Sequence, residues 1–496
     1  MRGVKGFIAG TLVSRVLGLI REAFIAYLLG AKDAADAFYV ALRVPMILRD
    51  MVAENVVQTA FVPSFIEAKE RFKTPETFLS AVLVVGGVGL GLITVLGVLA
   101  APWLVKLTAW GFSGQKLALA SHLTRLMFPL VLLVSASALA SGLLNTKKRF
   151  FVPSLSPAFF NMGIVSAGAM AAWVLRSSPT LSATALAAGV LVGGAGQILF
   201  QMPFLRGFKL KKPDFKHPSL KSLKKLLLPV LVSTGFSRLT LVVNTIIASF
   251  LGTGAVAYLN YAFRMMQLPL GLFGVGVATV ALPAMAEKAA KKQDATQDLG
   301  VAEAMSFFLN APATVFMIFA AQPIIALIFS RGSFGLADSY KAASALVFYA
   351  IAVPAISLSR VYLNYLFANK RVREPNISFG IAAGVNITLS LALAPLMGFP
   401  GLALATGIAS WVQTLFLRSV VASDKWNWRL GLMLGLSLAC FGAAWLLLSG
   451  FNTWVQVFGE MITGSALYLL STRLVGMRYL GLLFARSPET SPEESV

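Results

Sequence analysis

The sequence predicts an all-α polytopic membrane protein, and three observations lead to this fold class. Hydrophobic residues make up 57% of the 496-residue chain and charged residues only 12%, which is about half the charged fraction of a typical soluble domain. Apolar stretches long enough to cross a bilayer follow one another almost to the C-terminus. An internal repeat then divides most of these stretches into two matching sets.

About fourteen segments have the length and apolar character of transmembrane helices. They lie at about 7–29, 36–66, 78–105, 118–144, 151–175, 181–204, 226–251, 256–285, 302–330, 339–368, 376–396, 400–422, 430–449 and 455–484. Most of the 42 Lys and Arg residues lie in alternate loops, on the side that also holds both termini. The positive-inside rule therefore predicts that both termini are cytoplasmic.

The two halves of the chain resemble each other at a spacing of about 223 residues. Ser14-Arg15 corresponds to Ser237-Arg238, Pro45 to Pro269, and Gln197 to Gln413. An even number of helices in each repeat gives two parallel six-helix lobes around a central cavity, which is a transporter architecture. The expected organisation is an N-lobe at 1–205, a basic cytoplasmic linker at 206–225, a C-lobe at 226–425, two extra helices at 426–486 and a disordered tail at 487–496.

Several classes of function lack the residues that they need. The chain has no GxxxxGK(S/T) phosphate loop, so no nucleotide site is expected. Its single cysteine and two histidines form no metal-ligand cluster, and no catalytic triad or paired carboxylate is recognisable. Glycine clusters at 86–91, 193–196 and 271–276 are expected to allow close helix packing. The basic charge follows the loops, which argues for a membrane topology and against nucleic acid.

Arginines lie inside the apolar segments, where an isolated charge costs about 2.5–3.5 kcal/mol on insertion scales. We therefore expect them to face a wet, cationic cavity. Because the guanidinium group binds phosphate bidentately and stays charged, an anionic diphosphate would suit such a cavity. The alternative is that sets such as Arg21, Glu22 and Asp36 join helices through buried ion pairs. Basic residues of the outer loops, Lys116 among them, are expected to be solvated. The charges within the segments are Arg15, Arg21, Glu22, Asp36, Arg43, Arg49, Asp50, Glu54, Arg238, Arg264 and Arg360.

Helical geometry adds two expectations about these charges. Arg15 and Glu22 share one side of the first helix, with Arg21 about 120° from Arg15. On the second segment, Asp36, Arg43, Asp50 and Glu54 share one side if the helix stays regular. Pro45 should bend that helix near its middle.

Several motifs resemble the lipid II flippase family MurJ (MviN), a branch of the multidrug/oligosaccharidyl-lipid/polysaccharide exporter superfamily. The matching segments are 14–22, 36–39, 45–49, 53–63, 145–153 and 261–271. The resemblance implies a flippase of the bacterial inner membrane, with lipid II and membrane lipids as partners and cell-wall synthesis proteins as candidate partners. It implies no cofactor and no enzymatic activity. The last two helices would form a groove for the polyprenyl tail.

The resemblance also implies a substrate-binding set, with a second set of residues that could contribute. The first set is Arg15, Arg21, Asp36, Arg49, Glu54 and Arg264; the second is Glu22, Arg43, Arg238 and Arg360. Some members of the family bind sodium through carboxylates at positions that here hold Asn244 and Ser390. With Asn386 and Thr406 these form a neutral set, which predicts at most a weak cation site because hard cations prefer carboxylate oxygen.

The expected function is therefore translocation of undecaprenyl-diphosphate-linked peptidoglycan precursor from the inner to the outer leaflet by alternating access. Two alternatives remain open at the level of sequence. One is a flippase for another polyprenyl-diphosphate glycan, and the other is a drug or cation exporter of the same superfamily. The exporter predicts a cavity dominated by acids and aromatic residues.

Overall fold

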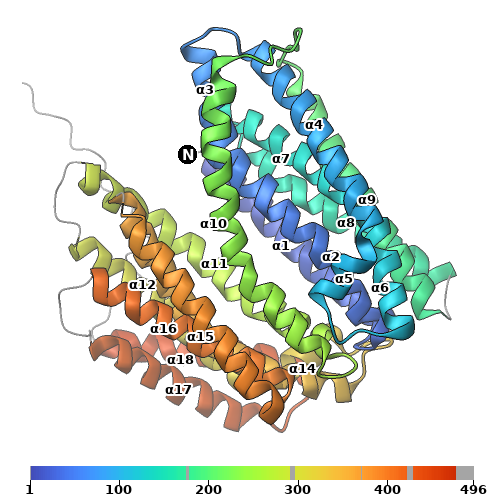
Figure 1. Ribbon diagram of the computed structural model, residues 1–496. Helices are drawn as coiled ribbons and strands as arrows, with labels where there is room; N and C mark the ends of the chain where they lie inside the picture. The colour runs from blue at the N-terminus through green and yellow to red at the C-terminus, as the bar shows by residue number, and fades with distance from the viewer. Residues whose placement is uncertain (1, 175–177, 291–295, 370, 422–427, 476–496) are drawn as a thin grey trace, which may run out of the picture. The chain divides into compact units, whose positions relative to one another are not determined.

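The computed structural model describes residues 2–174, 178–290, 296–369, 371–421 and 428–475. Nearly all of this part of the chain is helical, and it contains no β-strand (Figure 1). The prediction of an all-α protein is confirmed. The predicted tail at 487–496 lies outside the described residues.

Helices in the first half of the chain fall on the predicted segments, several of them in two or three pieces. They are α1 (Arg2–Leu29), α2 (Asp33–Arg49), η1 (Asp50–Phe61), α3 (Val62–Glu70), α4 (Pro75–Leu99), α5 (Ala101–Thr108), α6 (Gly114–Met127), α7 (Leu130–Thr146), α8 (Phe151–Val174), α9 (Pro179–Gln201) and η2 (Met202–Leu205). Helix starts follow local chemistry: Ser178 and then Pro179 begin α9, and the Ser178 hydroxyl accepts the Leu181 N–H.

The second half of the chain is helical in the same way. Its helices are α10 (Pro218–Ser249), α11 (Ala255–Ala290), α12 (Thr296–Phe319), α13 (Ala321–Phe329), α14 (Leu336–Ala368), α15 (Arg373–Met397), α16 (Phe399–Val421), α17 (Trp428–Leu448) and α18 (Thr453–Leu474). The basic segment at 206–225 is divided between an irregular stretch and the first turns of α10. His217 caps α10 because its ring Nδ1 accepts the Ser219 N–H, 3.2 Å away.

Nine helical spans in the described part of the chain are long and apolar enough to cross a membrane. In α4 only 6% of the most apolar window is buried. An apolar helix with so little protein cover needs another apolar environment, and a bilayer provides it. The other predicted segments, including the charged ones, are also helical over the residues that the structure describes. The chain is thus a multi-pass helical membrane protein, while the number fourteen stays a prediction.

The second charged segment departs from the regular helix assumed in the sequence analysis. After Arg49 the backbone winds as a π-helix through Asp50–Phe61 and returns to α-helix at Val62. A π-helix has more residues per turn than an α-helix. The condition on which Asp36, Arg43, Asp50 and Glu54 were expected to share one side, a regular helix, is therefore not met beyond Asp50.

Contacts divide the chain into two compact units. The N-terminal unit comprises Met1–Asn260 together with the loop Phe329–Asp338, and the C-terminal unit comprises Tyr261–Ile328 and Ser339–Val496. Within the first unit, α10 packs against η1 and α3. In the second, α17 pairs with α18 and packs against α12. The two six-helix lobes inferred from the repeat stay a prediction.

A buried ion pair joins three helices of the C-terminal unit. Arg418 on α16 pairs with Glu303 on α12, and both side chains are largely buried. The hydroxyl of Tyr362 on α14 donates to Glu303 Oε1 at 2.8 Å. Because the carboxylate is neutralised and hydrogen-bonded, it can lie inside an apolar core.

Glycines set the distance between α8 and α9. A Cβ added at Gly163 would overlap the backbone of Gly193, and one added at Gly189 would lie 2.8 Å from the Gly163 carbonyl oxygen. These two helices can approach this closely only because both lack side chains at the crossing. The packing role predicted for the cluster at 193–196 is confirmed at Gly193.

The same role is wrong for the cluster at 86–91. A Cβ at Gly86, Gly87, Gly89 or Gly91 would meet nothing within 4 Å. These glycines lie on α4, whose apolar surface is exposed, so no neighbouring helix uses the space that they leave. In the cluster at 271–276, the side chains from residue 274 onward lie outside the described residues.

This contrast gives a paired prediction. Gly163→Ala should lower the thermal unfolding temperature in detergent, since overpacking costs about 1–3 kcal/mol. Gly87→Ala should leave it unchanged or raise it, because alanine in an open helix position gains about 0.5–1 kcal/mol over glycine. Equal unfolding temperatures for the two variants would contradict the crossing described here.

Candidate functional site

Arg21 and Glu22 of α1 form a buried polar network with α2 and α8. The two side chains pair with each other, and both residues are almost fully buried. Arg21 also donates to Asn161 Oδ1 at 2.9 Å, and the Tyr39 hydroxyl donates to Glu22 Oε2 at 2.7 Å. The Arg21 guanidinium lies over the Phe160 ring, 5.9 Å from its centroid. This arrangement matches the alternative in which a buried pair joins helices.

Arg15 differs from Arg21 although both lie on α1. Its side chain is half-buried, and within the described part of the chain its guanidinium makes no hydrogen bond or ion pair. Arg15 and Glu22 are expected on one side of the helix, but Glu22 pairs with Arg21. Arg15 therefore carries a positive charge that the described residues do not neutralise.

Arg49 and Arg238 share a carboxylate. Arg49 donates from Nε and Nη2 to Asp50 Oδ1 at 2.9 and 2.6 Å, and Arg238 Nη2 lies 3.1 Å from Asp50 Oδ2. Arg238 is on α10, so this pair ties α10 to the junction of α2 and η1. Arg43, two turns before Arg49, also reaches toward α10 and α11: it donates to Thr245 and, at 2.9 Å, to Asn260 Oδ1.

Arg49 also lines a cavity of about 230 Å³ in the N-terminal unit. The other lining residues come from α7, α8 and α9 and combine hydroxyl, amide and apolar groups. They are Val134, Ser137, Ala138, Ser141, Pro153, Ser156, Pro157, Phe160 and Gln197.

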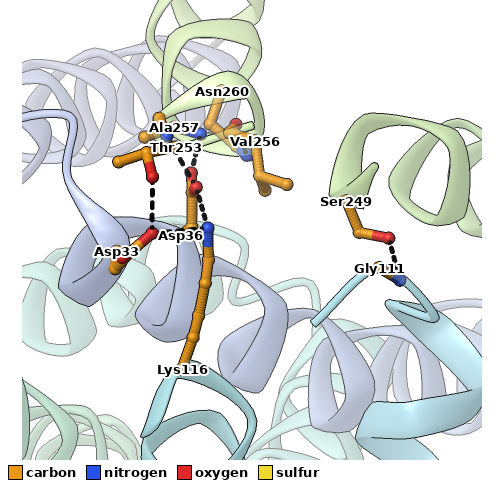
Figure 2. Close-up of polar contacts among 10 residues, drawn as sticks. Asp33, Asp36, Gly111, Lys116, Ser249, Thr253, Val256, Ala257 and Asn260 are labelled. Carbon is orange, nitrogen blue, oxygen red and sulfur yellow. Dashed lines mark hydrogen bonds and ion pairs between the residues drawn. The ribbon is translucent and has the colours of Figure 1, made fainter. Parts of the chain in front are cut away.

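Asp36 lies at the other end of α2 and is completely buried (Figure 2). Its two oxygens accept the backbone N–H groups of Gly254 and Ala257 at 2.7 and 2.8 Å, and Lys116 Nζ lies 2.7 Å away. Because α11 begins at Ala255, the carboxylate caps the positive end of that helix. All these contacts lie within the N-terminal unit.

Neighbouring contacts extend this Asp36 cluster. Lys116 also pairs with Asp33 at 2.8 Å, and Asp33 Oδ1 accepts the Thr253 hydroxyl at 3.0 Å (Figure 2). Beside it, the Gly111 N–H donates to Ser249 Oγ at 2.9 Å. The expectation that Lys116 is a solvated loop charge is wrong: its side chain is only 14% exposed. The carboxylates of α2 draw its ammonium group inward.

The loop Phe329–Asp338 contacts the same end of the N-terminal unit. The Ser333 N–H donates to the Tyr27 carbonyl at 2.8 Å, and the Tyr258 hydroxyl donates to Asp338 Oδ1 at 2.6 Å. The end of α1 and the beginnings of α2 and α11 are therefore bound together by charged and backbone hydrogen bonds.

The remaining predicted residues lie elsewhere. Arg264 and Arg360 belong to the C-terminal unit, where Arg264 is exposed and Arg360 donates to the Leu270 carbonyl at 3.3 Å. The side chain of Glu54 lies outside the described residues. The structure joins Arg49 with Arg238 and Arg21 with Glu22, while convergence of the whole set on one cavity stays a prediction.

The four residues of the suggested weak cation site fall in both units. Asn386, Ser390 and Thr406 lie on α15 and α16, and Asn244 lies on α10 of the N-terminal unit. Asn386 Nδ2 donates to Thr406 Oγ1 at 3.1 Å, whereas its buried Oδ1 has no partner in the described part of the chain. The set is neutral, as the sequence predicts, and its use as a cation site stays a prediction.

Sequence reasoning missed the neutral partners of these charges. Asn161 and the backbone of residues 254–257 hold predicted site residues, yet nothing in their own sequence context marks them. The only sequence signal at Gln197 is its place in the internal repeat. Polar residues inside the apolar segments were the one available signal, because such residues usually bond across helices.

Multiple apolar helices with arginines held inside the helix assembly define a membrane transporter fold. Several solved structures share it. A multidrug resistance MATE transporter of the MOP superfamily in an inward-facing conformation is similar with a TM-score of 0.67 and 15% identity, covering 82% of this chain and 94% of that one. That likeness concerns the fold alone.

The family follows from closer matches. The family model described as lipid II flippase MurJ matches residues 25–470, so the chain belongs to the MurJ family. Lipid II flippase MurJ of Burkholderia cenocepacia is 34% identical over 84% of this chain and 81% of its own length. A probable lipid II flippase MurJ of Thermotoga maritima is 30% identical over 97% and 98%. A structure of MurJ in an inward closed conformation gives a TM-score of 0.84 at 25% identity, covering 95% and 98%. The predicted resemblance is confirmed.

The Asp36 cluster allows a matched test of burial. Asp36→Asn should lower the unfolding temperature strongly, because breaking a buried charge pair costs about 3–5 kcal/mol. Asp33→Asn removes a carboxylate that is 57% exposed and also touches Lys116, so it should cost about 0–1 kcal/mol. Thermal unfolding of the two purified variants in detergent compares them. Similar losses in the two variants would show that burial does not increase the contribution of Asp36 to stability.

Proposed function

We propose that this protein moves lipid II from the inner to the outer leaflet of a bacterial cytoplasmic membrane by alternating access. Both termini lie in the cytoplasm, and the protein acts as a transporter and not as an enzyme. Membership of the MurJ family over residues 25–470 supports lipid II as the substrate. Cell-wall synthesis proteins are candidate partners.

Within the structure, the proposal rests on the environment of the Arg15 guanidinium. A half-buried guanidinium without a partner in the described residues, on a helix of low polarity, is costly unless water or an anion reaches it. The diphosphate of lipid II supplies such an anion, and its oxygens match the bidentate donors of arginine. Arg49 and Arg238 of the N-terminal unit, and Arg264 and Arg360 of the C-terminal unit, are proposed as further residues that contact the substrate.

Arg21 has a different role in this proposal. Its charge is used by Glu22, and its hydrogen bonds connect α1 with α8. Arg21 therefore positions the helix that carries Arg15. In this proposal it contributes to substrate binding indirectly, by holding Arg15 in place.

The Asp36 cluster holds one end of the N-terminal unit together in this proposal. It binds the N-terminus of α11 to α2 through a buried carboxylate. We assign this end to the external face, following the positive-inside topology.

The function is tested by depleting the protein in its host. Lipid II accessible to an impermeant hydrolase added outside should fall while total lipid II accumulates, because synthesis continues on the inner leaflet. Export of another undecaprenyl-diphosphate-linked glycan in the same cells serves as the control. Loss of that glycan with normal lipid II exposure would favour the alternative flippase.

The two arginines of α1 should separate transport from stability. Arg15→Gln should abolish lipid II exposure and leave the unfolding temperature unchanged or higher, since an unpaired charge is removed. Arg21→Gln should lower the unfolding temperature, because it leaves the Glu22 carboxylate buried, at a cost of about 3–5 kcal/mol. Exposure assays and thermal unfolding on both variants check this. A destabilised but active Arg15 variant would contradict the assignment.

A further inference from the structure

The cavity lined by Arg49 carries an inference that deepens the proposed function. Its volume of about 230 Å³ falls below the roughly 300–1,000 Å³ typical of pockets for drug-sized ligands. It can therefore hold one ring-sized group of a larger substrate. The question is which part of the substrate has matching chemistry.

The charge of the cavity excludes a diphosphate. Among the described lining residues only Arg49 is charged, and its guanidinium already donates twice to Asp50. One guanidinium at the edge of the cavity, with part of its donors used by Asp50, is too little to hold a whole diphosphate inside it. Carboxylates of a peptide would meet the same difficulty. The occupant that fits is uncharged.

The polar groups of the cavity suit hydroxyls and amides. Ser137 Oγ accepts from Gln201 Nε2 at 2.6 Å and Ser141 Oγ donates to Gln201 Oε1 at 2.9 Å. Each hydroxyl keeps hydrogen-bonding capacity for a ligand: Ser137 its proton and Ser141 its lone pairs. A fixed pair of hydroxyls beside one another, held by a buried glutamine, is a rigid recognition element.

Gln197 adds an uncommitted amide. No hydrogen bond to its side chain occurs among the described residues, although Gln201 binds its backbone carbonyl. Its counterpart in the internal repeat is Gln413, whose Nε2 donates to Ser378 Oγ at 3.3 Å. The side-chain amide of Gln413 is thus hydrogen-bonded within the C-terminal unit, whereas that of Gln197 in the N-terminal unit is available to a ligand.

The apolar walls complete the fit. Phe160 offers a ring, and Val134, Ala138 and Pro157 offer aliphatic surface. A sugar ring has apolar C–H faces between its hydroxyl edges, so it matches a cavity that mixes these groups. A polyprenyl chain would leave the serines and the amide without partners, which is unfavourable.

We propose that this cavity binds one N-acetylated sugar ring of the lipid II headgroup. Gln197 pairs with the acetamido group or a ring hydroxyl, and Ser137 and Ser141 bind further hydroxyls. Arg49 stands between this sugar subsite and the diphosphate site. The inference rests on the proposed function, because it assumes a glycan-diphosphate substrate.

The test compares binding of lipid II with binding of undecaprenyl diphosphate, which has no sugar. Gln197→Leu removes the amide at similar volume, and Ala138→Leu fills the cavity. The control Ala188→Leu adds the same side chain at an exposed position of α9. Affinities are measured on the purified full-length protein in nanodiscs, together with its unfolding temperature.

The Gln197 variant should bind lipid II about tenfold more weakly, the value expected for one lost hydrogen bond. The Ala138 variant should lose at least as much, while both keep the wild-type affinity for undecaprenyl diphosphate and the control keeps both affinities. Equal weakening for the two lipids, or none for either, overturns the subsite. If the wild-type protein itself binds lipid II no better than undecaprenyl diphosphate, the proposed substrate fails instead.

Discussion

The low dielectric of the membrane is the constraint on which the rest of the structure depends. Within it a charge must be paired, solvated or bound to a ligand. Arg21 is buried and paired with Glu22, and Asp36 is buried against backbone amides and Lys116. Arg15 has no partner among the described residues, so water or a ligand must stabilise its charge. Arg15 is therefore the residue whose charge is available to an anionic substrate.

Both α1 and α2 carry charges on more than one side. Some of these charges therefore pair with neighbouring helices, whereas others remain available to a ligand. The carboxylate of Asp50 holds Arg49 and Arg238 together, so α10 is fixed to the π-helical turn that follows α2. The helical period changes directly after Arg49, which itself lines a polar cavity. A helix with a regular period would have lacked this turn at the point where the charges are concentrated.

The fold class and the family could be predicted because their signals are repeated along the whole chain. Apolar length, the distribution of Lys and Arg and the repeat each give the same answer many times. The site could be predicted only in its residue types. A buried pair of Arg21 with Glu22 was one of the alternatives, and the structure contains it; the contact of Arg21 with Asn161 of α8 could not be predicted.

By itself, then, the sequence determined that this protein is a helical membrane protein with buried arginines and a MurJ-type pattern, because hydropathy and motifs are local properties. Only the tertiary structure decided which charges are paired within the protein. Lys116 was expected in solvent and is drawn to Asp36 from a distant helix, and Gln197 lacks the serine partner of its repeat counterpart Gln413. Such pairings depend on packing between segments distant in sequence, and no local pattern records them.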